Sequence, residues 1–295
     1  MEENLEDILR NGFLTWRKNL NIAVPFLLSS IINLLLIVIF ITIIYFFLNP
    51  FQSSFATASY GRYSPLSSIN WLLLLLDILL VISFLIIMSI ISSFFYAGAI
   101  GMSKKAIETG KTTLDDMIEY GKKKFITIFL INLLIFIFVL IICLILAIIQ
   151  MIFRGEFITI FVTIVDIVFA VVPFAVVIGD LGVIEGLKKG FRFFIDNKFP
   201  VVLLWIFVRY ITQFIGYIPI FIAAIIFSIG ILFVPIPSDI SSIPSFTSPN
   251  LLIPLLLVFL LTIAVSILVS WIISVFVISP LTTIWWSKLY LDGKK

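Results

Sequence analysis

Long apolar stretches dominate this chain and restrict its fold more than any other feature. Each contains at least the roughly 20 residues that a helix needs to cross the hydrocarbon core of a bilayer. They lack the alternation of barrel strands, so helices are the expected form. The stretches are residues 20–48, 70–101, 125–153, 157–179, 200–234 and 251–287. We predict an all-α integral membrane protein with six transmembrane helices, forming a single polytopic domain over residues 1–295.

Composition supports this class, because 62% of the residues are hydrophobic, only 12% are charged and the mean hydropathy is +1.27. Such a chain has too few polar groups to cover a water-soluble globule. The start "MEENLEDILR" is acidic, which is not typical of a signal peptide. The last two apolar stretches are longer than one crossing of the bilayer requires. We expect Pro219, Pro254 and Pro280 to kink them or to mark where they leave the bilayer.

Most of the 19 lysine and arginine residues lie on one side of the predicted spans. They occupy the N-terminal segment, the connections at 102–124 and 180–199, and the C-terminus, whereas the opposite connections hold only Arg62 and Arg154. The positive-inside rule then places both termini in the cytoplasm of a multi-pass cell-membrane protein. Basic clusters beside apolar stretches favour contact with the bilayer and its anionic headgroups at the cytoplasmic face. A protein partner or a second copy is a further candidate, and the absence of an extended basic stripe argues against nucleic acid.

A short motif returns before several spans. Residues 9–21 read "LRNGFLTWRKNLN", and residues 187–199 read "LKKGFRFFIDNKF". One template of two apolar residues, a glycine and an aromatic, at positions i, i+4, i+7 and i+11, fits before the first, third and fifth spans and lies on one helix face. Its glycine and aromatic positions are Gly12, Trp16, Gly121, Phe125, Gly190 and Phe194.

This pattern predicts three repeats, each a cytoplasmic amphipathic helix followed by a transmembrane hairpin. The units cover about 4–101, 113–179 and 180–287. In the first helix, Leu9 and the motif's glycine and tryptophan are expected to face the membrane, and each glycine should permit close approach of a neighbouring span. The alternative interpretation is that the three segments are not repeats, because many cytoplasmic loops of membrane proteins contain amphipathic stretches.

Capping signals mark the start of each predicted entry helix. Thr113 followed by Asp116 is a capping-box pattern, and Asn4 or Asp180 is expected to cap the other two.

A family resemblance accompanies these entry segments. The stretches "VPFAVVIGDLGVIEGLKKGFRFFIDNKFPVVLL" (172–204), "GFLTWRKNLNIAVPFLL" (12–28) and "AIETGKTTLDDMIEYGKKKF" (106–125) resemble a group of uncharacterised, largely archaeal polytopic membrane proteins. These are distantly similar to the membrane domain of some glycerophosphoryl diester phosphodiesterases. The catalytic histidines of those enzymes have no counterpart, because this chain contains no histidine. The resemblance therefore implies a fold and a membrane context without a reaction.

Three charged residues interrupt the apolar spans. Asp77, Asp166 and Arg209 each lie roughly 10–17 Å from a span end at 1.5 Å per residue, so all three are expected to meet near the midplane. Isolated charges at that depth are costly, which favours burial in the bundle and pairing. Gln213 and Asn132 are candidates for the same network. A structural Arg–Asp pair is the favoured interpretation, and a polar site for a transported solute is the alternative.

Small polar and aromatic residues mark the last span. Thr262, Ser266, Ser270 and Ser274 follow at four-residue spacing, which favours tight helix packing over the lining of a pore. Trp285 and Trp286 are expected in an interfacial aromatic belt, with Trp71 and Tyr60 at the other interface.

No catalytic, metal-binding or cofactor-binding pattern is present. The absence of histidine excludes Ser–His–Asp and Cys–His sets, the aspartates lack metal-site spacing, and "GAIG" at 98–101 is too short for a dinucleotide fingerprint. We therefore expect a non-catalytic membrane-organising or accessory protein that contacts lipid or partner proteins, without cofactor or metal. The alternative is a transporter or channel with a site around Arg209, Asp77 and Asp166. An intramembrane enzyme acting on lipid, with Asp77 and Asp166 as its only candidate acids, has the least support.

Overall fold

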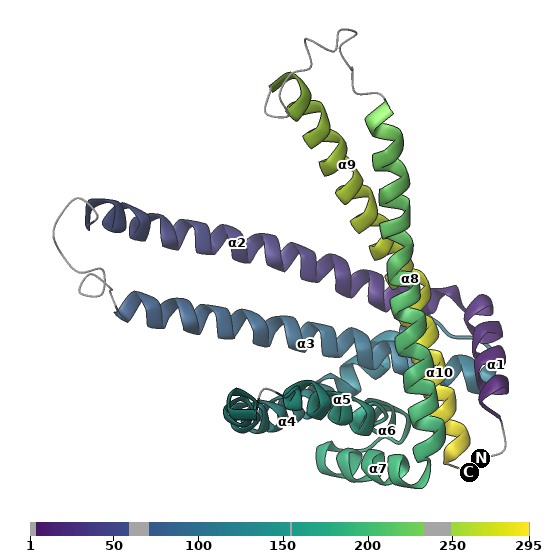
Figure 1. Ribbon diagram of the computed structural model, residues 1–295. Helices are drawn as coiled ribbons and strands as arrows, with labels where there is room; N and C mark the ends of the chain where they lie inside the picture. The colour runs from purple at the N-terminus through teal and green to yellow at the C-terminus, as the bar shows by residue number, and fades with distance from the viewer. Residues whose placement is uncertain (1–3, 59–70, 154, 233–248, 295) are drawn as a thin grey trace.

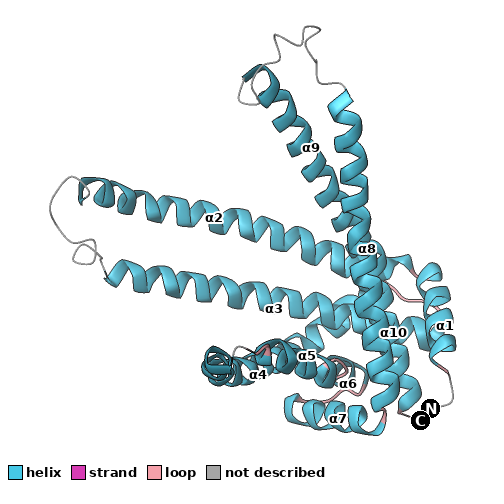
Figure 2. Ribbon diagram, in the orientation of Figure 1, coloured by secondary structure: helices cyan, strands magenta, loops and turns pink. Residues whose placement is uncertain are grey.

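The protein is a helical, multi-pass membrane protein. The computed structural model describes residues 4–58, 71–153, 155–232 and 249–294, and these ranges contain no β-strand (Figure 2). The helices are α1 (Leu5–Lys18), α2 (Val24–Ala58), α3 (Trp71–Thr109), α4 (Leu114–Phe153), α5 (Phe157–Phe169), α6 (Val172–Ile178), α7 (Val183–Asp196), α8 (Lys198–Leu232), α9 (Pro249–Ile273) and α10 (Ser279–Gly293).

Six segments of the described chain are long and apolar enough to cross a membrane. They are Leu20–Tyr45, Leu75–Thr109, Leu114–Phe153, Phe157–Ile178, Lys198–Ile229 and Leu256–Gly293. The predicted class and number of transmembrane helices are thus confirmed, and the division into three repeats stays a prediction.

Three helical hairpins extend in different directions from one end of the molecule (Figure 1). They are α2–α3, α4–α5 and α8–α9. The short helices α1, α6 and α7, together with α10, lie where the hairpins converge, and both chain termini are at this end. We call this end the terminal hub. Along the rest of their length the hairpins are apolar and exposed, with Leu34, Phe136 and Phe221 each more than 60% accessible.

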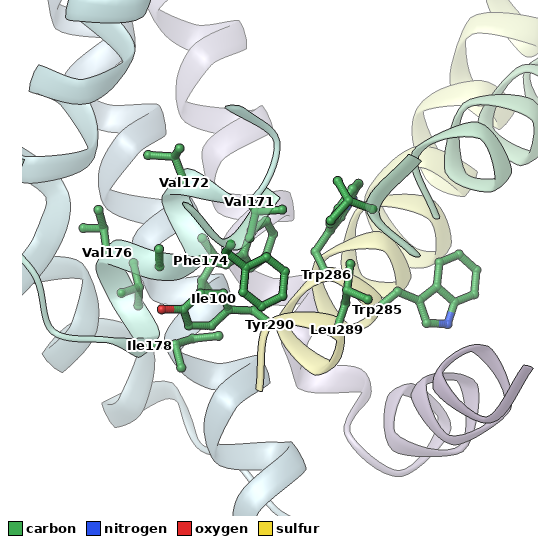
Figure 3. Packing of buried hydrophobic residues seen from close by; sticks show 14 of the residues in the cluster. Ile100, Val171, Val172, Phe174, Val176, Ile178, Trp285, Trp286, Leu289 and Tyr290 are labelled. Atoms are coloured by element: carbon green, nitrogen blue, oxygen red, sulfur yellow. The ribbon is translucent and has the colours of Figure 1, made fainter. Parts of the chain in front are cut away.

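The hydrophobic core lies in the terminal hub, with α10 at its centre. Phe174 of α6 stacks on Trp286 with the ring centroids 6.3 Å apart, and Phe193 of α7 contacts Tyr290 at 5.1 Å. Figure 3 shows Trp285 directed to the opposite side of α10, toward α1. The main buried cluster therefore lies in the terminal hub, where residues from all three hairpins meet.

Two prolines coincide with interruptions of the predicted spans. The fourth apolar stretch divides at residues 170–171, and Pro173 lies in the first turn of α6, where a missing N–H costs nothing. The sixth divides at a π-helical turn, Ser274–Ile278, and Pro280 lies in the first turn of α10. Pro219 lies inside a continuous α8, so the fifth stretch is not interrupted there.

The three entry segments differ in how they end. α1 and α7 stop at Asn19 and Asn197, whose backbone N–H groups bond to the carbonyl oxygens of Trp16 and Phe193. The middle segment has no such asparagine, and it continues without a break into the span as α4. The prediction of a separate middle helix is therefore wrong, because the residue that terminates the other two is absent.

The capping predictions have mixed outcomes. The capping box is confirmed, since the backbone N–H of Thr113 donates to Asp116 at 2.8 Å and the N–H of Asp116 donates to the Thr113 hydroxyl at 3.4 Å. Asn4 is the N-cap of α1 but its side chain makes no capping bond. The N-cap of α7 is Gly182, so the assignment of Asp180 as a cap is wrong.

Asp180 instead fastens the α6–α7 connection to α4. It has a left-handed φ of 54°, and its carboxylate accepts hydrogen bonds from Lys123 and Lys124, both at 2.7 Å. Lys124 also donates to the carbonyl oxygen of Leu181 at 3.0 Å. The hydrogen bond from Lys123, followed in importance by that from Lys124, lowers the pKa of the Asp180 carboxyl to about 2.

A pH dependence follows from this lowered pKa. A carboxyl with a depressed native pKa adds stability above its ordinary pKa and loses that contribution as the pH falls toward the native value. We expect Asp180→Asn to lower the thermal unfolding midpoint at pH 5, and the difference from the wild type to vanish between about pH 4 and pH 2. Thermal unfolding in detergent over this range measures it, and a difference that stays constant would contradict the assignment.

Candidate functional site

Polar residues predicted from three different spans line one cavity. Asn132 of α4, Asp166 of α5 and Arg209 of α8 all border a space of about 500 Å³. Tyr96 of α3 and Trp205 of α8 also line it. The lining residues come from α3, α4, α5 and α8, so each of the three hairpins contributes to the cavity.

The charges in this cavity do not form a closed ion pair. The carboxylate of Asp166 accepts a hydrogen bond from the indole N–H of Trp205 at 3.0 Å. Within the described chain, the guanidinium of Arg209 has neither an ion pair nor a hydrogen bond, although Asp166 lines the same cavity. Both side chains are exposed to the cavity. The structure therefore does not contain the sealed Arg–Asp pair that the sequence favours.

Two smaller cavities continue this space toward the terminal hub. The first, about 280 Å³, shares Asp166, Trp205 and Arg209 with it, and the second, about 220 Å³, reaches Thr282 and Trp286 of α10. Tyr96 lines all three. We call this set of three adjoining cavities the central crevice. It has a charged end at Arg209 and Asp166 and an aromatic end at the hub.

The other two residues of the predicted midplane network lie outside the lining of the central crevice. Asp77 precedes Tyr96 on α3 by about 28 Å of helix axis at 1.5 Å per residue, so it does not meet Asp166 and Arg209. Gln213 is exposed one turn beyond Arg209 and makes no hydrogen bond within the described chain. Asp166 and Arg209 thus line the same cavities and Asp77 does not, because equal depth along diverging hairpins does not bring residues together.

Two residues of the polar stripe in the last span bond within their own helix. Thr262 is buried and donates to the Val258 carbonyl oxygen at 2.7 Å, and Ser266 donates to that of Thr262 at 2.7 Å. Ser270 is half-buried, and Ser274 begins the π-helical turn, where four-residue spacing no longer keeps side chains in line. The hydroxyls of Thr262 and Ser266 bond back to the helix, as serine and threonine commonly do in apolar surroundings. None of the four residues lines a crevice cavity.

The glycines of the entry motif lie at close helix contacts. A Cβ on Gly12 would lie 2.4 Å from Cδ1 of Trp285, and one on Gly190 would lie 2.9 Å from Cα of Val172. A Cβ on Gly121 would lie 3.1 Å from the Phe94 carbonyl oxygen, and the ring of Phe94 also contacts Phe125. Each glycine permits a neighbouring element to approach.

The face of α1 that carries the motif meets protein and not the membrane. Gly12 is buried against α10, Leu9 accepts a hydrogen bond from Trp285 at 3.1 Å, and the Trp16 indole donates to the Phe276 carbonyl oxygen at 3.2 Å. The expectation that this face contacts lipid is therefore wrong, since its periodic apolar residues pack on α10. Phe13 and Leu14 are the exposed apolar residues of this helix.

The placement of Trp285 and Trp286 also corrects an expectation. They are 6% and 7% exposed in the core of the hub, so they do not form an interfacial belt. In the hub, α10 packs against α1, α3 and α6. Tyr60 and the side chain of Trp71 lie outside the described residues.

Two residues that sequence reasoning set aside prove to be central packing positions. Gly98 and Gly101 belong to the "GAIG" run, and a Cβ on either would lie within 2.8 Å of Met117 or Tyr120 of α4. Two small residues three positions apart in a long apolar helix, which lie on one of its faces, are the signal for this close helix pair.

No metal-binding cluster of three or more His, Cys, Asp or Glu side chains occurs in the part of the chain that the structure describes. No family model matches this chain, and neither the curated proteins nor the solved structures contain a match.

Proposed function

We propose that this is a non-catalytic, membrane-organising protein of the cell membrane that contacts lipid through three hairpins held apart by its terminal hub. One observation carries the proposal: the core lies at the hub, while the outer lengths of the hairpins present exposed apolar side chains such as Leu35, Ile141 and Phe221. In a membrane such surfaces are covered by lipid or by another protein. A partner protein or a second copy of the chain is therefore compatible with the same role.

The terminal hub is assigned to the cytoplasmic side in this proposal. It contains the lysine clusters at 104–105, 122–124 and 188–189, and basic residues accumulate on the cytoplasmic side of membrane proteins. Exposed basic residues there would also attract anionic headgroups of the inner leaflet. α7 adds Ile184, Phe191 and Ile195, which are exposed apolar residues on one helix face.

Spin-labelled phospholipid in reconstituted vesicles tests this role. Diverging hairpins expose more surface to lipid than a compact bundle, so we expect more motionally restricted lipid per protein than for a compact six-helix membrane protein at the same ratio. We also expect no flux of ions or small solutes. An equal amount of restricted lipid would contradict the proposed role.

A transporter or channel is the second candidate, favoured by the open position of Arg209 in the central crevice. A solute flux in wild-type vesicles that Arg209→Met abolishes, with an unchanged unfolding midpoint, would establish transport and reject a purely organising role.

A further inference from the structure

The central crevice carries separate positive and negative groups. Arg209 presents a guanidinium without a partner in the described chain, and Asp166 presents a carboxylate that only Trp205 engages. An arginine at membrane depth is costly unless an anion or water solvates it. The guanidinium fork matches a phosphate group in a two-bond geometry, which makes phosphate its natural ligand.

The negative end of the crevice is suited to an ammonium group. Asp166 shares the second cavity with the aromatic residues Tyr96, Phe174, Trp205 and Trp286. Ammonium groups are recognised by aromatic faces together with a carboxylate. The indole of Trp205 fixes the carboxylate, since its N–H donates to it at 3.0 Å. One charge of each sign in a shared cavity matches a ligand that has one charge of each sign.

The lining also indicates a ligand with an apolar part. Ile135, Val139 and Val162 border the same cavity as the charged residues. They continue into the exposed apolar lengths of α4 and α5, including Phe138 and Ile160. A soluble zwitterion would leave this apolar wall uncovered, whereas the acyl or isoprenoid chains of a lipid would cover it.

We propose that the central crevice binds the headgroup of an aminophospholipid, with its phosphate on Arg209 and its ammonium group at Asp166. The inference rests on the proposed lipid-contacting role and names the lipid class that one site selects. It differs from the attraction of anionic headgroups to the lysines of the hub, because the crevice has no net charge.

Native mass spectrometry of the purified protein with added lipid tests the site. We expect retention of phosphatidylethanolamine in preference to phosphatidylglycerol of the same chains. Arg209→Gln should lower the affinity for both lipids by about tenfold, because a charge-assisted bond to phosphate is lost. Asp166→Asn should lower the affinity for phosphatidylethanolamine alone, also by about tenfold, and so remove the preference.

Matched controls exist within the chain. Asp77→Asn changes an aspartate in a span outside the crevice, and Arg192→Gln changes an arginine whose side chain is 85% exposed. Neither should lower the retention of phosphatidylethanolamine. Unfolding midpoints identify variants that fail to fold. If a crevice variant fails, Trp205→Phe is measured in its place. This substitution keeps an aromatic ring and frees the Asp166 carboxylate, so it should weaken the preference for phosphatidylethanolamine. Equal effects of control and crevice variants would overturn the proposal.

Competition with O-phosphoethanolamine tests whether the ligand is a lipid or a soluble zwitterion, because this compound has the same charged groups without chains. We expect it to compete with the lipid only weakly. Competition at the affinity of the lipid itself would overturn the lipid assignment and identify a soluble ligand. The amount of restricted lipid around the hairpins does not depend on Arg209, so loss of this site and failure of the organising role are separate results.

Discussion

Replacing Gly101 with alanine is expected to destabilise the protein by about 2 kcal/mol, although alanine is the better helix former. A Cβ at this position would lie 2.1 Å from Cγ and 2.4 Å from Cβ of Tyr120. The Cβ of Tyr120 cannot move away without its backbone, so the contact requires α3 and α4 to separate. This helix pair is the most extensive contact between elements of the described chain.

Gly216 provides the matched control for this substitution. It lies inside α8, and a Cβ there would meet nothing within 4 Å. Gly216→Ala should therefore stabilise the protein by about 0.5–1 kcal/mol through helix propensity alone. Unfolding in mixed micelles with increasing sodium dodecyl sulfate measures both variants. Similar shifts for the two alanines would show that α3 and α4 are not in close contact at Gly101.

Replacing Trp285 with alanine is expected to cost about 3–5 kcal/mol and to release α1 from the hub. The indole is 6% exposed, packs beside Gly12, and donates its N–H to the Leu9 carbonyl oxygen at 3.1 Å. Its ring also contacts Phe207 of α8, with 5.5 Å between centroids. Loss of the side chain removes the surface on which α1 docks and leaves a cavity between two helices.

Hydrogen exchange of the amides in residues 5–18 locates this effect. We expect their protection to fall sharply in Trp285→Ala and modestly in Trp285→Phe, which keeps an aromatic ring and loses the hydrogen bond at a cost of about 1 kcal/mol. Protection of α1 that is unchanged in Trp285→Ala would show that this helix is held by the membrane and not by α10.

The sequence predicts the spans well, because a segment in a bilayer must satisfy its backbone internally. Length and apolarity therefore determine the elements at 20–48 or 125–153 without knowledge of their partners. The interruptions are local as well, since Pro173 and Pro280 each lie in the first turn of a helix. The same local chemistry explains why the middle entry segment, which has no terminating asparagine, runs on into α4.

The direction of amphipathic faces is not a local property. Leu9, Gly12 and Trp16 form the same periodic face whether it meets lipid or α10, so periodicity alone does not decide between them. Depth counted along a helix likewise does not reveal how hairpins are arranged around the hub. For this reason the counted depths do not show that Asp166 and Arg209 line one cavity, with Asn132, while Asp77 lies outside it.

Chemical access to the central crevice tests the account most directly, because diverging hairpins and an open Arg209 both require it. Thr212 lines the crevice and Thr262 is 5% exposed, so Thr212→Cys and Thr262→Cys, each with Cys143→Ala, form a matched pair of threonines within spans. We predict that a small, membrane-impermeant methanethiosulfonate applied to reconstituted protein modifies the cysteine at 212 and leaves that at 262 unmodified. If both react only after denaturation, the hairpins form a closed bundle and the central crevice does not exist in the membrane.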